Sequence, residues 1–443
     1  MPSVTVPSSD SPSPLAARLA AVRLLDAVLR RKRFVDDAIE DDPGWRDLDD
    51  RDRGFARLLC ATVLRRLHQC DAWIDACLER PLPPKVTAVR TVLRLGIAQI
   101  AFIGTPAHAT LATSVDLTRA LGFSGYTGLV NAILRRFVRE GRDVFAARET
   151  SGEAARLNMP GWLLKAWEKA YGNQTGMAVT QASLCEAPLD LSVKSHAGDW
   201  AARLNGCVLP GGTVRLNRGK SINNLDGYAE GAWWVQDAAA AIPARLFGSL
   251  EGRQAVDLCA APGGKTAQLA AAGASVTAVD RSARRLRRLS DNLARLSLSA
   301  TVVEAEVVQW RADQLFDAVL LDAPCSATGT MRRHPELMHL KSEQDCVALA
   351  RTQAALLRAA SEMVKPGGVL VYCVCSLQPE EGEEQIAAAL REGISLRRLP
   401  VGAEEIGGLS EAITSDGDVR TLPCMMADLG GMDGFFAARL QKI

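Results

Sequence analysis

The chain has 443 residues, with 48% hydrophobic residues, 23% charged residues and a formal net charge of +1 at pH 7. This length predicts two or three domains, and the composition excludes a largely disordered chain. A net charge near zero gives no overall attraction to nucleic acid, so any basic surface has to be local. No run of residues approaches the about 18 uninterrupted apolar positions of a membrane-spanning helix, so no membrane span is expected.

The eleven cysteines are irregularly spaced, which does not indicate a disulfide framework. The five histidines and the lack of a repeated CxxC pattern give no reason to expect a metal site. Free thiols suit a reducing compartment, so we expect a cytoplasmic protein.

The first half of the chain is predicted to be mainly helical. Residues 1–14 are rich in Pro and Ser and lack an apolar signal core, which predicts a disordered tail. Residues 15–145 carry apolar side chains at helical spacing and predict a bundle of about six helices. Residues 146–245 are mixed: "LDLSVK" at 189–194 alternates like a strand, and we expect a small α+β linker domain.

From residue 246 to the end, apolar strand patterns alternate with amphipathic helices. "RQAVDLCA", "ASVTAVD", "ATVVEAE", "FDAVLLDA" and "GVLVYCVC" are predicted strands, and "DGFFAARLQ" is a predicted last strand. This alternation predicts a parallel sheet covered on both faces, in an α/β Rossmann-like domain. Such sheets bind ligands at the carboxyl ends of their strands.

The stretch "DLCAAPGGKT" at 257–266 lies where the first of these strands turns into a helix. Neither the phosphate-binding GxxxxGK[ST] pattern nor the dinucleotide pattern GxGxxG is present, which leaves S-adenosylmethionine as the common ligand for such an edge. Asp280, at the end of the second strand, is placed to accept hydrogen bonds from ribose hydroxyls. Glu304 or Glu306, at the third strand, could reach the adenine. The alternative is an ordinary glycine turn with a helix-capping aspartate.

Two cysteines follow predicted strands at the same edge, Cys325 in "LLDAPCSATG" and Cys375 in "VYCVCSL". Carbon 5 of a pyrimidine is a poor nucleophile until a thiolate adds to carbon 6. A pair of thiols, one attacking and one assisting release, suits methylation at that carbon. Asp322 is placed to hold the ring nitrogen and amino group of the target base. The neighbouring Cys373 points to the same face as Cys375, but deeper, and is interpreted as packing.

The four motifs "DLCAAPGGKT", "LLDAPCSATG", "VYCVCSLQPEE" and "DGFFAARLQK", in this order, resemble the RNA (cytosine-5) methyltransferases of the NOL1/NOP2/sun family. "LRLGIAQIAF", "PAHATLATSVDLTRALG" and "VNAILRRF" resemble the NusB RNA-binding fold. Their combination is similar to the bacterial group that methylates 16S rRNA, and the resemblance covers about residues 15–443. It implies a multidomain protein: a NusB-like helical domain (15–145), a linker domain (146–245) and a Rossmann-like methyltransferase domain (246–443).

The resemblance also implies roles for individual residues. Cys375 is expected to be the nucleophile and Cys325 to assist product release, with Asp322 on the target base. Two positions depart from the family pattern: Val374 stands where threonine is usual, and Glu306 where aspartate is usual. The residues expected to bind S-adenosylmethionine, with no metal, are Cys259, Ala260, Ala261, Pro262, Gly263, Gly264, Lys265, Asp280, Glu306 and Asp322.

The basic stretch Arg332, Arg333 and His334 follows the Cys325 loop and is predicted to contact RNA phosphates. The expected partner is 16S rRNA or a naked small-subunit rRNA precursor, bound by a monomer. The same chemistry on tRNA or another RNA, and a catalytically idle RNA-binding assembly factor, are the alternatives. DNA is a weaker alternative, because it would make Cys325 of the Pro-Cys pair the nucleophile.

Overall fold

The computed structural model describes residues 14–216 and 222–443. The described chain divides into two compact units. Unit 1 contains the N-terminal residues up to Leu164 together with His334–Leu340, and unit 2 contains Lys165–Arg333 and Lys341–Ile443.

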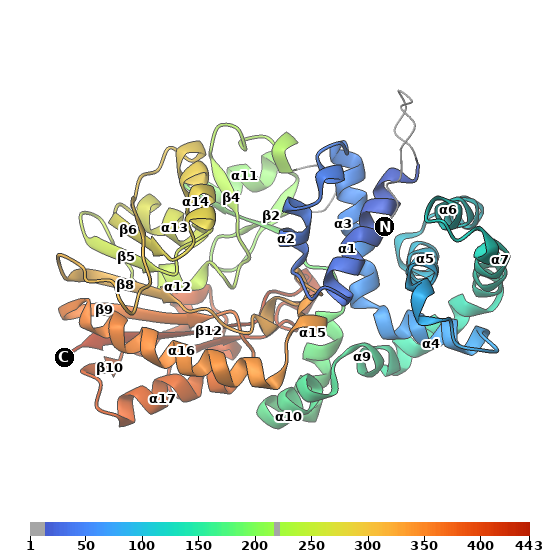
Figure 1. The fold of residues 1–443 in the computed structure, drawn as a ribbon. Helices are drawn as coiled ribbons and strands as arrows, with labels where there is room; N and C mark the ends of the chain where they lie inside the picture. Colours follow the sequence, from blue (N-terminus) through green and yellow to red (C-terminus); the bar gives the residue numbers. More distant parts are fainter. Residues whose placement is uncertain (1–13, 217–221) are drawn as a thin grey trace. The chain divides into compact units, whose positions relative to one another are not determined.

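Unit 1 is helical, as the apolar spacing predicted (Figure 1). Its helices are α1 (Ala16–Leu29), α2 (Val35–Glu40), α3 (Asp50–Arg65), α4 (Leu67–Cys77), α5 (Thr87–Ala98), α6 (Ala107–Ala120), α7 (Thr127–Arg136), α8 (Arg142–Ser151) and α9 (Glu153–Asn158). The next helix, α10 (Gly161–Ser183), runs across the division between the units and is kinked at Gly172.

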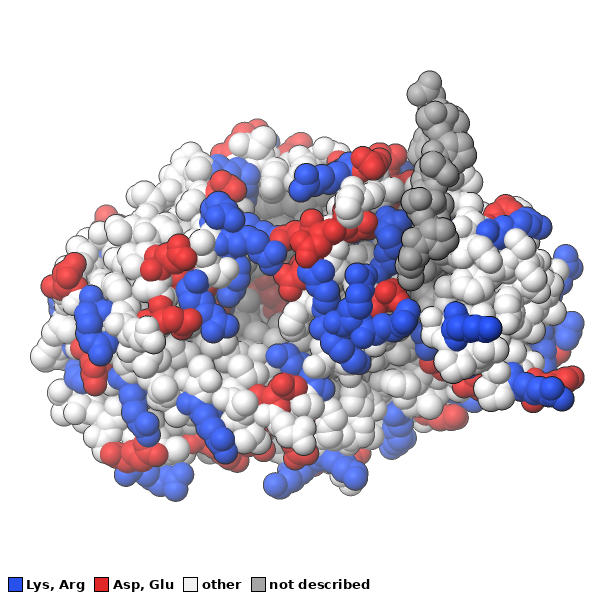
Figure 2. Space-filling model, in the orientation of Figure 1, with Lys and Arg blue, Asp and Glu red and all other residues white. Residues whose placement is uncertain are grey.

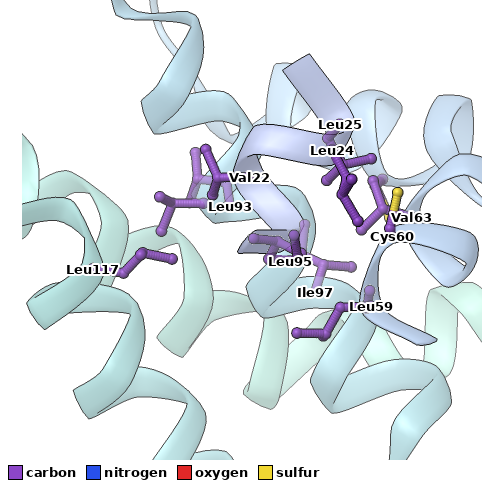
Figure 3. Packing of buried hydrophobic residues seen from close by; sticks show 14 of the residues in the cluster. Val22, Leu24, Leu25, Leu59, Cys60, Val63, Leu93, Leu95, Ile97 and Leu117 are labelled. Atoms are coloured by element: carbon purple, nitrogen blue, oxygen red, sulfur yellow. The ribbon is translucent and has the colours of Figure 1, made fainter. Parts of the chain in front are cut away.

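The core of unit 1 is formed by the apolar faces of α1, α3 and α5 with residues of α6 and α7. Figure 3 shows Leu24 and Leu25 of α1 close to Val63 of α3, with side chains of α5 beside them. Cys60 and Cys70 are buried in this core, so the interpretation of both as small packing residues is confirmed. One helical stretch, Pro84–Ile103, is long and apolar enough to cross a membrane, but 61% of its most apolar window is buried, as in a core helix.

A segment from the second half of the chain completes unit 1. Residues 334–340, with the short helix α15 (Leu337–Leu340), belong to it. Leu337 and Met338 are buried, and His339 Nε2 forms a 2.8 Å hydrogen bond with the carbonyl oxygen of Leu64. The sequence pattern does not indicate that residues 334–340 pack in unit 1.

Unit 2 contains a small antiparallel sheet and a larger mixed sheet. The small sheet has the order β2-β3-β1-β4, formed by β1 (Leu189–Val193), β2 (Gly206–Val208), β3 (Val214–Leu216) and β4 (Trp233–Val235). Leu191, Val214 and Trp233 form its core with α11 (Ala197–Arg203). The predicted strand at 189–194 is therefore confirmed as β1.

The larger sheet has the order β10-β12-β9-β8-β5-β6-β7, with β11 paired to β12. Strands β5 to β9 are parallel, and β12 runs antiparallel to β9. The bounds are β5 Gln254–Leu258, β6 Ser275–Asp280, β7 Thr301–Glu304, β8 Phe316–Asp322, β9 Val364–Val374, β10 Leu396–Arg398, β11 Val419–Thr421 and β12 Phe435–Lys442. The predicted Rossmann-like sheet and its last strand are confirmed.

Alternate residues along these strands face opposite sides of the sheet. Ala255, Leu320 and Val371 pack with residues of α12 (Ile242–Arg245) and α13 (Gly264–Ala271). Val256 and Leu321 pack with residues of α16 (Glu343–Glu362) and α17 (Glu383–Arg391) on the other side. Helix α14 (Ala283–Arg295) lies with Leu286, Leu289 and Leu293 toward α13 and β6. Both faces are thus covered, as expected for a parallel sheet.

The predicted domain boundaries at 145 and 245 do not coincide with this division. Helices α8 and α9 belong to unit 1, and the small sheet of the predicted linker domain shares unit 2 with the methyltransferase sheet. The prediction of a disordered tail at 1–14 falls, except for residue 14, outside the described residues.

Candidate active site

The carboxyl ends of the parallel strands bring the predicted site residues to one edge of the larger sheet. Strand β5 leads into the glycine-rich loop, β6 ends at Asp280, β8 ends at Asp322, and β9 ends one residue before Cys375. Such an edge is where open α/β sheets bind ligands.

The glycine-rich loop, residues 259–265, joins β5 to α13. Gly263 has a φ of +100°, and a Cβ atom there would lie 2.8 Å from Cγ of Leu289. Only glycine suits this backbone and this close approach. The loop therefore fixes the start of α13, where no side chain caps the helix.

Asp280 is 2% exposed, and its carboxylate accepts hydrogen bonds from the backbone N–H groups of Ala261 and Ser282. It is thus held against the glycine-rich loop. Glu306 lies two residues beyond the end of β7, is largely exposed, and is 3.7 Å from the guanidinium of Arg281. The structure brings Asp280 to the loop but leaves Glu306 on the surface.

Lys265 links the loop to β8. Its Nζ lies 2.7 Å from Oδ2 of Asp322, and the lysine is 8% exposed. Burial acts to lower the pKa of Lys265, but the charge of Asp322 and its hydrogen bond outweigh burial and raise that pKa. The pair keeps a charged lysine and a carboxylate side by side at the edge of the sheet.

The structure brings the two predicted cysteines together. Cys325 Sγ and Cys375 Sγ are 3.4 Å apart, in hydrogen-bond contact. The pKa of Cys325 is raised well above its usual range, first by the hydrogen bond with Cys375 and then by burial. Cys325 is therefore held as the neutral thiol, which can donate to a thiolate on Cys375.

The loops that carry these cysteines touch through backbone atoms. The N–H of Gly329 donates to the carbonyl oxygen of Cys375 at 3.0 Å. The N–H of Gly434 donates to the carbonyl oxygen of Gly329, and a Cβ on Gly329 would lie 1.9 Å from the carbonyl oxygen of Gly434. The sequence "SATG" after Cys325 thus ends in a glycine because another backbone occupies the space.

Two neighbours of Cys375 differ in their surroundings. Cys373 is completely buried on the same face of the sheet as Cys375, and its Sγ is 3.5 Å from Oδ1 of Asp322. Its predicted place, deeper in the sheet, is confirmed. Val374 packs on the opposite face, among residues of the α16 side. A valine in place of the usual threonine therefore leaves the face that carries the thiol unchanged.

The basic stretch beyond Cys325 lies mostly inside the protein. Arg332 is 2% exposed and donates to the carbonyl oxygens of Gly430 and Met432. Arg333 bridges the buried carboxylates of Asp237, at 2.6 Å, and Asp433, at 3.0 Å. These contacts give both arginines a structural role and do not favour them as phosphate ligands. His334 is exposed and belongs to unit 1.

Basic side chains also lie on the surface. On the face shown in Figure 2, Lys and Arg gather over unit 1 near α1 and α2, with acidic side chains among them. The sequence places Arg30, Arg31, Lys32 and Arg33 between these helices, and Arg31 and Arg33 are ion-paired with Asp26 and Asp41.

Two buried acids of the site, Asp257 and Glu381, are not recognisable from the sequence pattern. Asp257, in β5, is fully buried; its Oδ2 accepts from Thr266, and its Oδ1 has no hydrogen-bond partner among the described residues. Burial raises the pKa of Asp257 to about 7. Glu381, in "SLQPEE", is also fully buried. Both residues lie in the motifs given above, but the presence of Asp or Glu in a sequence does not show whether the side chain is buried.

The donor and acceptor set at this edge fits S-adenosylmethionine. Asp280 offers carboxylate oxygens for hydroxyl groups, and the orphaned Oδ1 of Asp257 is a buried acceptor that a ligand N–H group would satisfy. Among the described residues, no cluster of His, Cys, Asp and Glu has the arrangement of a metal site. The parallel sheet, the glycine-rich loop and these acids define the class of S-adenosylmethionine-dependent methyltransferases.

Comparison with known sequences narrows the class. Residues 246–441 match the family model of the 16S rRNA methyltransferase RsmB/F, and residues 15–139 match the NusB family. Ribosomal RNA small subunit methyltransferase B of Salmonella newport is 36% identical over 443 residues, covering 96% of this chain and 98% of the relative. The same protein of Salmonella typhi gives the same values. The chain belongs to the ribosomal RNA small subunit methyltransferase B family.

Solved structures share the fold of this chain. The crystal structure of PH0851 has a TM-score of 0.74 at 19% identity, covering 96% of this chain and 98% of that chain. A methyltransferase homologue from Pyrococcus horikoshii has a TM-score of 0.54 at 27% identity, covering 63% and 94%. NSun6 from the same organism, solved with SFG, has a TM-score of 0.55 at 19% identity, covering 64% and 98%. The two likenesses at 19% identity show the fold alone.

Proposed function

We propose that this protein transfers a methyl group from S-adenosylmethionine to carbon 5 of a cytosine in 16S rRNA, through a covalent bond between Cys375 and the base. The observation that carries the proposal is the 3.4 Å contact between Cys375 and Cys325 at the carboxyl edge of the sheet. A single buried thiol is ordinary packing, but two facing thiols beside Asp322 and Lys265 suit nucleophilic catalysis.

The residues around the thiols support a division of roles. Cys325 stays protonated because its pKa is raised, so we assign the attack on carbon 6 of the base to the sulfur of Cys375. Asp322, held by Lys265, lies beside them to hold the ring nitrogen and amino group of the cytosine. After removal of the carbon 5 proton, the Cys325 S–H is placed to assist the departure of the Cys375 sulfur.

The cofactor supplies an electrophilic methyl group when it is bound. We propose that the loop Cys259–Lys265 surrounds it, with Asp280 on its ribose and the exposed Glu306 on its adenine. The solved neighbour NSun6 was determined with SFG, which supports a ligand site of this kind in the fold. The substrate is proposed as 16S rRNA because the relatives of matching length are named for it, as is the family model. All eleven cysteines are free, which suits the cytoplasm as the compartment.

The cysteine roles are tested with two variants and an RNA substrate transcript. Cys375→Ala is expected to abolish methylation and any covalent adduct, because no sulfur remains to add to carbon 6. Cys325→Ala is expected to allow attack but to slow release, so that a denaturant-resistant protein–RNA complex accumulates on electrophoresis. A Cys207→Ala variant is the control, because that exposed thiol lies on β2 of the small sheet. The opposite result, an adduct lost with Cys325→Ala and kept with Cys375→Ala, would reverse the assignment.

The substrate is tested by bisulfite sequencing of total RNA from cells with and without the gene. Loss of one protected cytosine in small-subunit rRNA is the expected result. Unchanged rRNA together with a changed tRNA would overturn the choice of substrate while leaving the chemistry in place.

A further inference from the structure

The two cysteine loops meet again below the thiols, at a buried carboxylate. The serine after each cysteine, Ser326 and Ser376, is fully buried, as is Glu381. Both serine hydroxyls donate to the same oxygen of that carboxylate, Oε2 of Glu381. The two hydroxyl oxygens are themselves 3.0 Å apart.

The other carboxylate oxygen of Glu381, Oε1, makes a second contact with the loop that carries Cys325. Oε1 of Glu381 accepts the backbone N–H of Ser326 at 2.9 Å and Nε2 of Gln353 at 2.9 Å. The same Nε2 of Gln353, from α16, also donates to the carbonyl oxygen of Pro324 at 3.0 Å. The carboxylate thus holds Ser326 directly, and it holds Pro324, on the other side of Cys325, through Gln353.

Glu381 is itself fixed in place. It sits in the turn between β9 and α17, and its carbonyl oxygen accepts the hydroxyl of Tyr372 at 2.7 Å. Placing a carboxylate in a protein interior is costly, and hydrogen bonds to its oxygens have to offset that cost. Here those bonds come from the two catalytic loops and from α16, so the carboxylate ties together the segments that carry the thiols.

We propose that Glu381 is a positioning residue that sets the separation of the Cys325 and Cys375 thiols by holding both loops through the serine that follows each cysteine. The effect of Glu381 on methylation rests on the proposed function. Its effect on the distance between the two sulfurs does not. The negative charge of Glu381 adds to the hydrogen bond and burial that raise the pKa of Cys325, so the same residue also favours the neutral thiol at that position.

The proposal is tested by oxidising the full-length protein, without RNA, with the azo compound diamide. The two thiols lose their hydrogens to the N=N bond and form one S–S bond. The rate of this cross-link is divided by the rate of alkylation of Cys375 by iodoacetamide. Because both reactions need the Cys375 thiolate, its ionised fraction cancels in the ratio. Ser376→Ala keeps the charge of Glu381 beside Cys325, so a lowered ratio in that variant reports the separation of the sulfurs. Thermal melting and S-adenosylmethionine binding establish that each variant is folded.

Glu381→Gln is expected to lower this ratio by about tenfold or more, because the amide has one acceptor oxygen where the carboxylate has two. Ser376→Ala removes one of the two hydroxyl ties, keeps the carboxylate, and is expected to lower the ratio as well. Glu380→Gln is the matched control: its side chain is exposed one residue away, and the ratio should not change.

A folded Glu381→Gln protein with an unchanged ratio would overturn the proposal. If Glu381→Gln does not fold, Ser376→Ala decides: a lowered ratio supports the proposal, and an unchanged ratio overturns it. In a methylation assay, the turnover number of Glu381→Gln is expected to fall by about 10- to 100-fold, as for reacting groups displaced by about 1 Å. The cross-linking result does not depend on methylation, so failure of the proposed function and failure of this inference are distinguishable.

Discussion

At the scale of single residues, the edge of the sheet collects acids around one buried cation. Burial is the main reason that the pKa of Asp257 rises from 3.8 to about 7. The negative charges of Asp322 and Asp280 also raise this pKa, and the positive charge of Lys265 lowers it. The folded protein therefore binds a proton at Asp257 more tightly than the unfolded chain does. Below pH 3.8 the group costs no stability, and the cost develops as pH rises and is complete above pH 7.

The Asp257→Asn variant is expected to remove this dependence. Its melting temperature should rise relative to wild type as pH increases from 5 to 8, by an amount equivalent to at most about 3 kcal/mol. Asp291→Asn, at an exposed position on α14, is the control and should give a difference that does not change with pH. A flat difference for Asp257→Asn as well would mean that this carboxyl is ionised in the folded protein at all these pH values.

The residues for which we propose chemical roles stand in motifs that are recognisable in the sequence, whereas the buried groups around them are not recognisable in this way. Cys325, Cys375, Asp322 and Lys265 stand in quoted motifs at strand ends, and parallel topology brings strand ends together. Glu381 and Asp257 act through burial, which depends on tertiary packing that one acidic letter does not reveal. Arg332 and Arg333 resemble phosphate ligands in the sequence for the same reason: the carbonyl oxygens that Arg332 binds and the carboxylates that Arg333 binds, Asp237 and Asp433, are far away along the chain.

At the scale of elements, the connection from β5 to α13 depends on one backbone conformation. Gly263→Ala is expected to lower the stability of the protein by about 1–3 kcal/mol, because alanine is strained at a φ of +100° and its Cβ would clash with Leu289. Gly264→Ala is the matched control, because its φ is not positive and the nearest atom to its Cβ would be 3.7 Å away. Both variants are compared by thermal unfolding without cofactor; equal losses at the two positions would contradict the argument.

The longer strands and helices can be predicted from the sequence, because the spacing of their apolar residues and the Gly, Pro and polar residues at their ends indicate the same boundaries. Apolar runs in the sequence predict the strands β5, β6, β8 and β9. The short strands β2, β10 and β11 were not predicted, because three residues carry too little pattern. The kink of α10 at Gly172 likewise has no signal beyond the glycine itself.

At the scale of the whole molecule, each unit is assembled from separate parts of the chain. A domain prediction from sequence treats each domain as one continuous stretch of the chain. Residues 334–340, however, belong with the helices of unit 1. This stretch directly follows Arg333, which stays in unit 2, so the covalent chain passes from the Cys325 loop into the helical unit within a few residues. Contact between distant segments, rather than local pattern, decides such a boundary.

The packing of residues 334–340 in unit 1 is expected to depend on pH, because His339 lies in this segment. Burial, opposed by the hydrogen bond with Leu64, lowers the pKa of His339 from 6.5 to about 4. The unfolded chain then takes up a proton that the folded protein does not, so stability is lost as pH falls from 6.5 toward 4. For a partly exposed side chain this loss is about 2 kcal/mol at pH 5.

Replacement of His339 by Gln keeps a donor for the Leu64 carbonyl oxygen and removes the titration. Between pH 7 and pH 5 the melting temperature of wild type is expected to fall by more than that of His339→Gln. His108→Gln, at an exposed position in the same unit, should follow wild type. Parallel curves for wild type and His339→Gln would show that the histidine is solvated, and that the segment is not held in unit 1 by the contact with Leu64.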